Sequence, residues 1–365
     1  MVLRAQASRR PLLAHVDRQT ANRVRLKDYH RVARKVDGYL DQPNYAIRRC
    51  RLTNARYLNM IRFRRLTLRP LNDWLAAQLL KKTHRRYELR VWREVNGNFA
   101  AVRDELIEYV QEALEDARLR IRRGFEDSLS PFSDPIDDPA AHYPAMLNRI
   151  TLQGYLGETL AGLAVEHFGA FGNQDWHVPA FLFRFHDTEF QHLDLINERL
   201  LMSEEHEPDA VAERRPGRTG DDALAFRLDE TGKITHVLAL EAKCLVASNT
   251  DTINDAHAKL SAGPRRPSGI RELITLLSDY ETEEAQAWVA RLLDLYREGF
   301  KTVKRRDGLA YTVGHSPKRP ATRVSWLPVD APHPSYTVGR RFDAIEFQLE
   351  DLGGLVDTLY RRGGV

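Results

Sequence analysis

Two neighbouring acids and a later Glu-x-Lys pattern near the middle of the chain have a spacing that could support metal-assisted chemistry. A short apolar segment follows Asp221 and Asp222, and after a polar turn a second apolar segment leads into Glu241-Ala242-Lys243. Successive side chains of a strand point to opposite faces, so Glu241 and Lys243 would share one face. A charged pair at the buried end of a strand is costly unless other charges compensate it. A divalent metal ion held by Glu241 and an acid from the first strand would provide that compensation.

Hydrolysis of a phosphodiester bond is the reaction that these side chains would serve. Carboxylate oxygens are ligands suited to Mg²⁺, which can activate a water molecule and polarise a phosphoryl oxygen. Lys243 could orient that water or stabilise the negative charge that develops on the phosphate. The alternative is a structural ion pair between Glu241 and Lys243 with no part in catalysis.

A third carboxylate, Glu158, lies in a segment (144–168) that is predicted to be helical. Small residues let a helix approach another backbone closely, so Glu158 could be pressed against a sheet. An ordinary exposed Glu on a surface helix is the alternative. The small residues within one helical turn of it are Gly154, Gly157, Ala161 and Gly162.

Taken together, residues 145–250 resemble the restriction-endonuclease-like nucleases of the PD-(D/E)xK superfamily. The resemblance implies an α/β fold with a mixed sheet flanked by helices, and Mg²⁺ or Mn²⁺ as the cofactor. It implies that Glu158, Asp222 and Glu241 bind the metal and that Lys243 acts with them in catalysis. The proline of the signature is absent and Asp221 occupies its place, so either aspartate could be the ligand. Asp222 is favoured because it leads directly into the apolar strand.

The Gly-Glu helix and the Glu-Ala-Lys strand are also similar to those of anti-phage defence nucleases that work with a helicase, as in the Hachiman type. That similarity implies a helicase or ATPase partner, and cleavage of two strands would suit a homodimer. DNA is the favoured substrate. The rival hypothesis is a catalytically inactive nucleic-acid-binding or assembly protein with the same fold.

The charge of the chain is unevenly distributed, which favours a polyanionic partner. Its net charge is +4, but the first 100 residues carry 24 Lys and Arg against 7 Asp and Glu, and the remainder carries 31 against 44. A basic segment of this kind is typical of contact with nucleic acid. The alternative is a helical bundle whose basic faces are only solvated. The candidate contact residues are Arg48, Arg49, Arg51, Arg62, Arg64, Arg65, Lys81, Lys82, Arg85 and Arg86.

Composition and turn signals suggest a cytoplasmic protein of two domains; one large domain with extensions is the alternative. No apolar run approaches the length of a membrane span, there is no apolar signal segment, and two cysteines are too few for a disulfide framework. A proline-rich segment at 128–143 is predicted to be a linker between a mainly helical basic region (1–127) and a nuclease-like domain (144–365).

Periodicity predicts the remaining elements. Helices are expected at 98–123, 269–299 and 352–360, and strands at 178–185, 309–313, 323–327 and 342–348. A short helix should follow the loop that begins at residue 248. On it, Asn254, His257 and Lys259 follow at helical spacing and are predicted to face solvent; the alternative is that they line the cleft.

Overall fold

The computed structural model describes residues 66–78, 80, 84–125, 138, 140–182, 193, 195–196, 221–319 and 322–360. All of them belong to one compact unit, residues 56–365. Within this described part the chain forms an α/β structure with seven strands and seven helices. None of these helices is long and apolar enough to cross a lipid bilayer.

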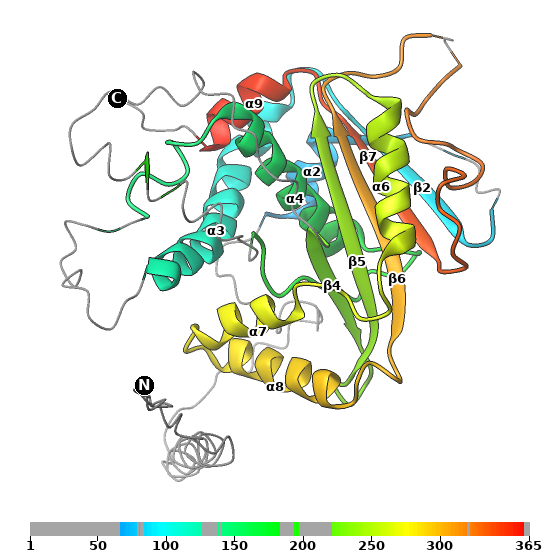
Figure 1. Ribbon diagram of the computed structural model, residues 1–365. Helices are drawn as coiled ribbons and strands as arrows, with labels where there is room; N and C mark the ends of the chain where they lie inside the picture. The colour runs from blue at the N-terminus through cyan, green and yellow to red at the C-terminus, as the bar shows by residue number, and fades with distance from the viewer. Residues whose placement is uncertain are drawn as a thin grey trace, which may run out of the picture. The chain divides into compact units, whose positions relative to one another are not determined.

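A seven-stranded mixed sheet forms the centre of the unit (Figure 1). Its order is β1-β2-β7-β6-β5-β4-β3. Strands β2, β7, β6 and β5 run parallel to one another. Strand β1 pairs antiparallel with β2, β4 pairs antiparallel with β5, and β3 pairs antiparallel with β4. The strands are β1 (Leu75–Gln78), β2 (Tyr87–Glu94), β3 (Trp176–His177), β4 (Ala223–Leu228), β5 (Ile234–Leu245), β6 (Lys304–Val313) and β7 (Phe342–Gln348).

The central strands are apolar on both faces because helices cover both sides of the sheet, as in other sheets with parallel pairing. In β5, Leu238 and Leu240 belong to the core on the α4 side. Val237 and Ala239 belong instead to the core formed with α7 and α8. This alternation assigns each side chain of β5 to one face.

Helix α4 (Arg149–Phe168) packs against β5, β6 and β4 on one face, together with α3 (Phe99–Phe125) and α9 (Leu352–Tyr360). Asn148 caps its first turn, because the Asn148 side chain accepts a hydrogen bond from the Thr151 N–H at 2.8 Å. Fourteen residues of α4 are buried, which places the helix deep in the core.

The opposite face of the sheet carries three helices that follow β5 in the chain. Helix α6 (Thr250–Ala262) lies along β5 and β6, as Figure 1 shows. Helices α7 (Ile270–Ser278) and α8 (Glu283–Arg297) pack on each other and on the neighbouring part of β5. The remaining helix, α2 (Leu68–Trp74), contacts α3 and β1.

The predicted mixed α/β architecture is confirmed, and so are the long helix near 98–123, the strand 342–348 and the helix 352–360. The segment 323–327 is not a strand: Ser325, Trp326 and Leu327 form a loop held by the buried carboxylate of Glu346. The helical segment 269–299 is divided into α7 and α8.

The two sides of the predicted 128–143 linker share one sheet and one core. Strand β2 pairs with β7, and α3 packs against α9 and shares a hydrophobic core with α4. The boundary predicted at 128–143 therefore does not divide the described residues into two packed units. The physical reason is that the pairing between residues 87–94 and 342–348 is non-local, so local composition does not predict it.

Candidate active site

Asp222 is fixed beside β5 by backbone hydrogen bonds at the point where β4 begins. Its N–H donates to the Leu240 carbonyl at 2.8 Å. Its Oδ2 accepts a hydrogen bond from the Ala242 N–H, also at 2.8 Å. Because Ala242 stands between Glu241 and Lys243, these bonds hold the Asp222 carboxylate against the Glu-Ala-Lys segment. This confirms the prediction that the two segments lie side by side.

Glu241 and Lys243 share one face of β5, as their spacing predicts. The Lys243 Nζ donates to Glu241 Oε1 at 2.6 Å. The side chain of Glu241 is only 1% exposed, whereas that of Lys243 is 29% exposed. The pair therefore has a buried carboxylate and a lysine side chain that is partly exposed to solvent.

A second lysine, Lys259 of α6, contacts both carboxylates. Its Nζ lies 2.5 Å from Glu241 Oε2 and 3.7 Å from Asp222 Oδ1. The prediction that Lys259 faces solvent is therefore wrong, and it is also wrong for His257, which is wholly buried. The signal in the sequence is weak: Lys259 follows the buried Ala256 by three residues, at the edge of the apolar stripe of α6.

The electrostatics of the cluster are those of a site that favours added positive charge. Burial and the nearby charge of Asp222 raise the pKa of Glu241 to about 7, although Lys243 and Lys259 act in the opposite direction. Burial alone would lower the pKa of Lys243. The carboxylates of Glu241, Asp222 and Glu158 outweigh that effect and raise its pKa, so Lys243 keeps its proton.

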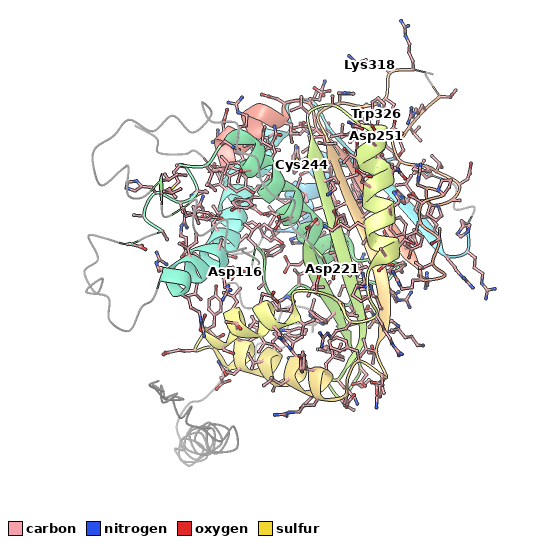
Figure 2. All side chains as sticks on the ribbon, viewed as in Figure 1. Asp116, Asp221, Cys244, Asp251, Lys318 and Trp326 are labelled. Atoms are coloured by element: carbon pink, nitrogen blue, oxygen red, sulfur yellow. The ribbon has the colours of Figure 1, made fainter. Side chains whose placement is uncertain are left out.

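Asp221 faces a different set of partners from Asp222. Its Oδ2 accepts hydrogen bonds from the Ser268 N–H and hydroxyl at 2.8 Å and 2.9 Å. Its Oδ1 lies 3.2 Å from the Arg305 guanidinium, which also pairs with Asp307 at 2.9 Å. Figure 2 labels Asp221 in the segment that leads into β4. Of the two aspartates that sequence left open, the geometry favours Asp222 as the residue facing Glu241.

Glu158 lies on α4 and is 8% exposed, so the alternative of an ordinary exposed glutamate does not hold. The adjacent Gly157 packs against β5: a Cβ atom added there would be 3.0 Å from the Cβ of Cys244, which Figure 2 also labels. Glu158 acts on Lys243 through its charge. The structure thus places Glu158 within electrostatic reach of the cluster, while direct contacts join Asp222, Glu241, Lys243 and Lys259.

Two carboxylates of this cluster fit the predicted metal ion. Within the described ranges, no group of three or more His, Cys, Asp or Glu side chains is arranged to hold a metal. Mg²⁺, however, is commonly bound by one or two carboxylates, with waters and substrate phosphate completing its shell. The Lys259 ammonium contacts both Asp222 and Glu241, which shows that one cation can interact with the two carboxylates together.

Most of the predicted nucleic-acid contacts lie outside the described residues. Arg85 and Arg86 are described and are exposed, and the Arg86 Nη1 donates to the Gly339 carbonyl at 3.2 Å. Both line a groove of about 370 Å³ together with His84 and Arg340. The other predicted contacts, for which the structure describes nothing, are Arg48, Arg49, Arg51, Arg62, Arg64, Arg65, Lys81 and Lys82.

No protein-family model matches the chain, and a search of curated proteins finds no significant match.

Proposed function

We propose that this chain is a metal-dependent nuclease of the restriction-endonuclease-like type, with DNA as the favoured substrate. The observation that carries the proposal is the clustering of Asp222, Glu241 and Lys243. The Ala242 N–H, between Glu241 and Lys243 in the chain, donates to Asp222 Oδ2 at 2.8 Å, and the Lys243 Nζ donates to Glu241 Oε1 at 2.6 Å. A structural ion pair needs only Glu241 and one lysine. Here burial and the charge of a second carboxylate, Asp222, raise the pKa of Glu241, which is unfavourable for stability and useful for holding a cation.

The order of the elements also supports the proposal. The helix that carries Glu158, the strand that Asp222 opens and the strand that contains Glu241-Ala242-Lys243 follow one another as α4, β4 and β5. They lie in a mixed sheet with helices on both faces. This is the arrangement that the sequence resemblance implies.

In this mechanism Asp222 and Glu241 would hold Mg²⁺ or Mn²⁺. The bound metal would supply positive charge opposite the negative charge that builds up on the phosphate. Lys243 keeps its proton and is partly exposed, so it can donate a hydrogen bond to a phosphate oxygen as that charge develops. Lys259 neutralises part of the carboxylate charge. Its ammonium group would have to move at least partly away from Asp222 and Glu241 when the metal binds.

The test is a cleavage assay on single- and double-stranded DNA and RNA with Mg²⁺, Mn²⁺ or EDTA. We expect cleavage by the wild-type protein only with metal. Lys243→Ala and Asp222→Asn should each lower the rate at least a hundredfold, an order of magnitude typical of losing one electrostatic group. Both variants should still bind the uncleaved strand, and Lys301→Ala, which removes an exposed lysine, should cleave normally.

The opposite outcome is equally informative. If wild-type protein binds nucleic acid but cleaves none of the four substrates with either metal, the non-enzymatic binding hypothesis replaces the nuclease. If Lys243→Ala cleaves as fast as Lys301→Ala, the pair of Glu241 and Lys243 is structural.

A further inference from the structure

Three arginines gather around two aromatic rings on the α4 face of the sheet. The Cζ atoms of Arg306 and Arg341 lie 4.8 Å and 4.9 Å from the centre of the Phe171 ring. The Cζ of Arg227 lies 5.8 Å from the centre of the Trp176 ring. Distances of this size are those of cation–π contacts. Two guanidinium groups thus meet at one phenylalanine, although they repel each other.

This arginine cluster is on the other side of the sheet from the candidate active site. Arg306 stands beside Leu238 in the register of β5 and β6, and Leu238 faces the α4 core. Glu241 is three residues further along β5, so it faces the opposite side. The two sites are also separated by about 10 Å along the strand, at about 3.3 Å per residue.

Among the described residues, Asp175 is the one carboxylate that forms an ion pair with this cluster. Arg227 pairs with Asp175 at 2.6 Å, but neither Arg306 nor Arg341 has an ion-pair partner in the described part of the chain. Burial, together with the positive charges of Arg341 and Arg227, lowers the pKa of Arg306 to about 10. Burial and the charges of Arg306, Arg227 and Lys304 likewise lower the pKa of His236 to about 4, which leaves that ring neutral.

Several N–H groups of the cluster are buried without a hydrogen-bond partner among the described residues. They are the Nε and Nη1 of Arg306, the Nε of Arg341 and the Nε of Arg227. A buried donor left unpaired costs about 1–3 kcal/mol, so several in one place need an explanation. An acceptor from outside the chain would satisfy them.

The loop that carries Phe171 is held in an unusual conformation, which keeps the ring in place. Phe171 has a φ of 54°, in the left-handed region that non-glycine residues seldom adopt. Its N–H donates to Asp343 Oδ2 at 2.7 Å, and Arg90 pairs with the same carboxylate at 3.1 Å. These contacts fix the ring before any ligand arrives.

We propose that Arg227, Arg306 and Arg341 form a binding site for a phosphoryl group. A guanidinium group presents a planar fork of donors that matches the oxygens of a phosphate, and two or three such groups supply the charge it needs. The exposed Lys304 and the partly exposed arginines leave the site open to solvent. The phosphoryl group comes either from a nucleic-acid backbone or from free phosphate, and the two sources can be separated by experiment.

The test compares the wild-type chain with the double variant Arg306→Gln/Arg341→Gln in EDTA, so that it is independent of metal and of cleavage. Arg271→Gln is the matched control, because Arg271 also lies over an aromatic ring, that of Tyr296, but is exposed and hydrogen-bonded to the Tyr296 hydroxyl. Inorganic phosphate should raise the melting temperature of the wild type more than chloride at equal ionic strength. The double variant should bind phosphate at least tenfold more weakly, and the control should be unchanged.

A labelled oligonucleotide supplies the second arm. If the site takes a backbone phosphate, the double variant should bind the oligonucleotide more weakly and the slope of log K against log salt should fall by about 1. If the double variant binds inorganic phosphate more weakly but binds the oligonucleotide as the wild type does, free phosphate is the source. The proposal is overturned if wild-type protein shows no effect of phosphate beyond that of chloride and neither ligand distinguishes the double variant from Arg271→Gln. Arg306→Lys/Arg341→Lys keeps both charges without the planar fork of donors. It takes the place of the double variant in both comparisons if the double variant does not fold.

Discussion

The Nζ atom of Lys259 lies 2.5 Å from Glu241 Oε2, so a helix that follows β5 delivers a second ammonium group to the carboxylate that β5 buries. Glu241 therefore has a lysine on each oxygen, Lys243 on Oε1 and Lys259 on Oε2. Lys259 also reaches Asp222.

Lys259→Met should destabilise the protein at pH 8 in EDTA, because a buried carboxylate loses one of its two counter-charges. We expect a loss of about 1–3 kcal/mol in the free energy of unfolding. Mn²⁺ should restore most of it and should bind the variant more tightly than the wild type, since no ammonium competes for the same carboxylates. Urea unfolding and calorimetric titration measure the two effects. Lys301→Met, which changes an exposed lysine, is the control; equal behaviour of the two variants would contradict the prediction.

Asp221 and Asp222 should give opposite results when each is changed to Asn. Asp221→Asn leaves the buried Arg305 with one carboxylate instead of two and should lower the free energy of unfolding by about 3 kcal/mol. Asp222→Asn keeps an oxygen for the Ala242 N–H, so it should cost less than about 1 kcal/mol. Mn²⁺ affinity should fall at least tenfold only in Asp222→Asn. A reversed pattern in unfolding and metal titration would assign the ligand to Asp221.

Substitution by alanine should have opposite effects on stability at Gly162 and Gly154 of α4. A Cβ atom at Gly162 would overlap the ring of Phe181, which is buried and cannot move aside. Gly162→Ala should therefore destabilise the protein by about 1–3 kcal/mol. Gly154 is exposed and has no atom near the added Cβ, so Gly154→Ala should stabilise by up to about 1 kcal/mol through helix propensity. Thermal unfolding of both variants measures the difference, and equal shifts would show that α4 is not packed as described.

The low pKa of His257 should make the free energy of unfolding fall in mild acid. Burial lowers its pKa from 6.5 to about 4, while the Ile253 carbonyl acts in the opposite direction. Between these two pKa values the unfolded chain binds a proton that the folded chain does not, so the contribution to stability is complete above pH 6.5 and is lost as pH falls toward 4. The shift corresponds to about 3 kcal/mol.

His257→Leu removes this contribution and should flatten the dependence of the unfolding free energy on pH between 6.5 and 4. Urea unfolding at several pH values in this window gives the slope for each protein. Identical slopes in the wild type and the variant would show that His257 is protonated in the folded state.

The sequence by itself determined the local features of this protein. The alternation of β5 places Glu241 and Lys243 on one face, and the small residues of α4 mark a helix that packs closely against the sheet at Gly157. Strand 342–348 and helix 352–360 follow from periodicity alone, because the periods of 2 and 3.6 residues are set by backbone geometry.

Only the tertiary structure decided which distant residues meet. Asp221 and Asp222 are neighbours in the chain but have different partners. Arg305 and Ser268 contact Asp221, whereas the Ala242 N–H donates to Asp222. Lys259 reaches Glu241 only through the path of α6, and the arginine cluster exists only because β4, β6 and the start of β7 lie in one sheet. Non-local pairing is fixed by the packing of the whole core, so no local pattern of residue types could have specified these contacts.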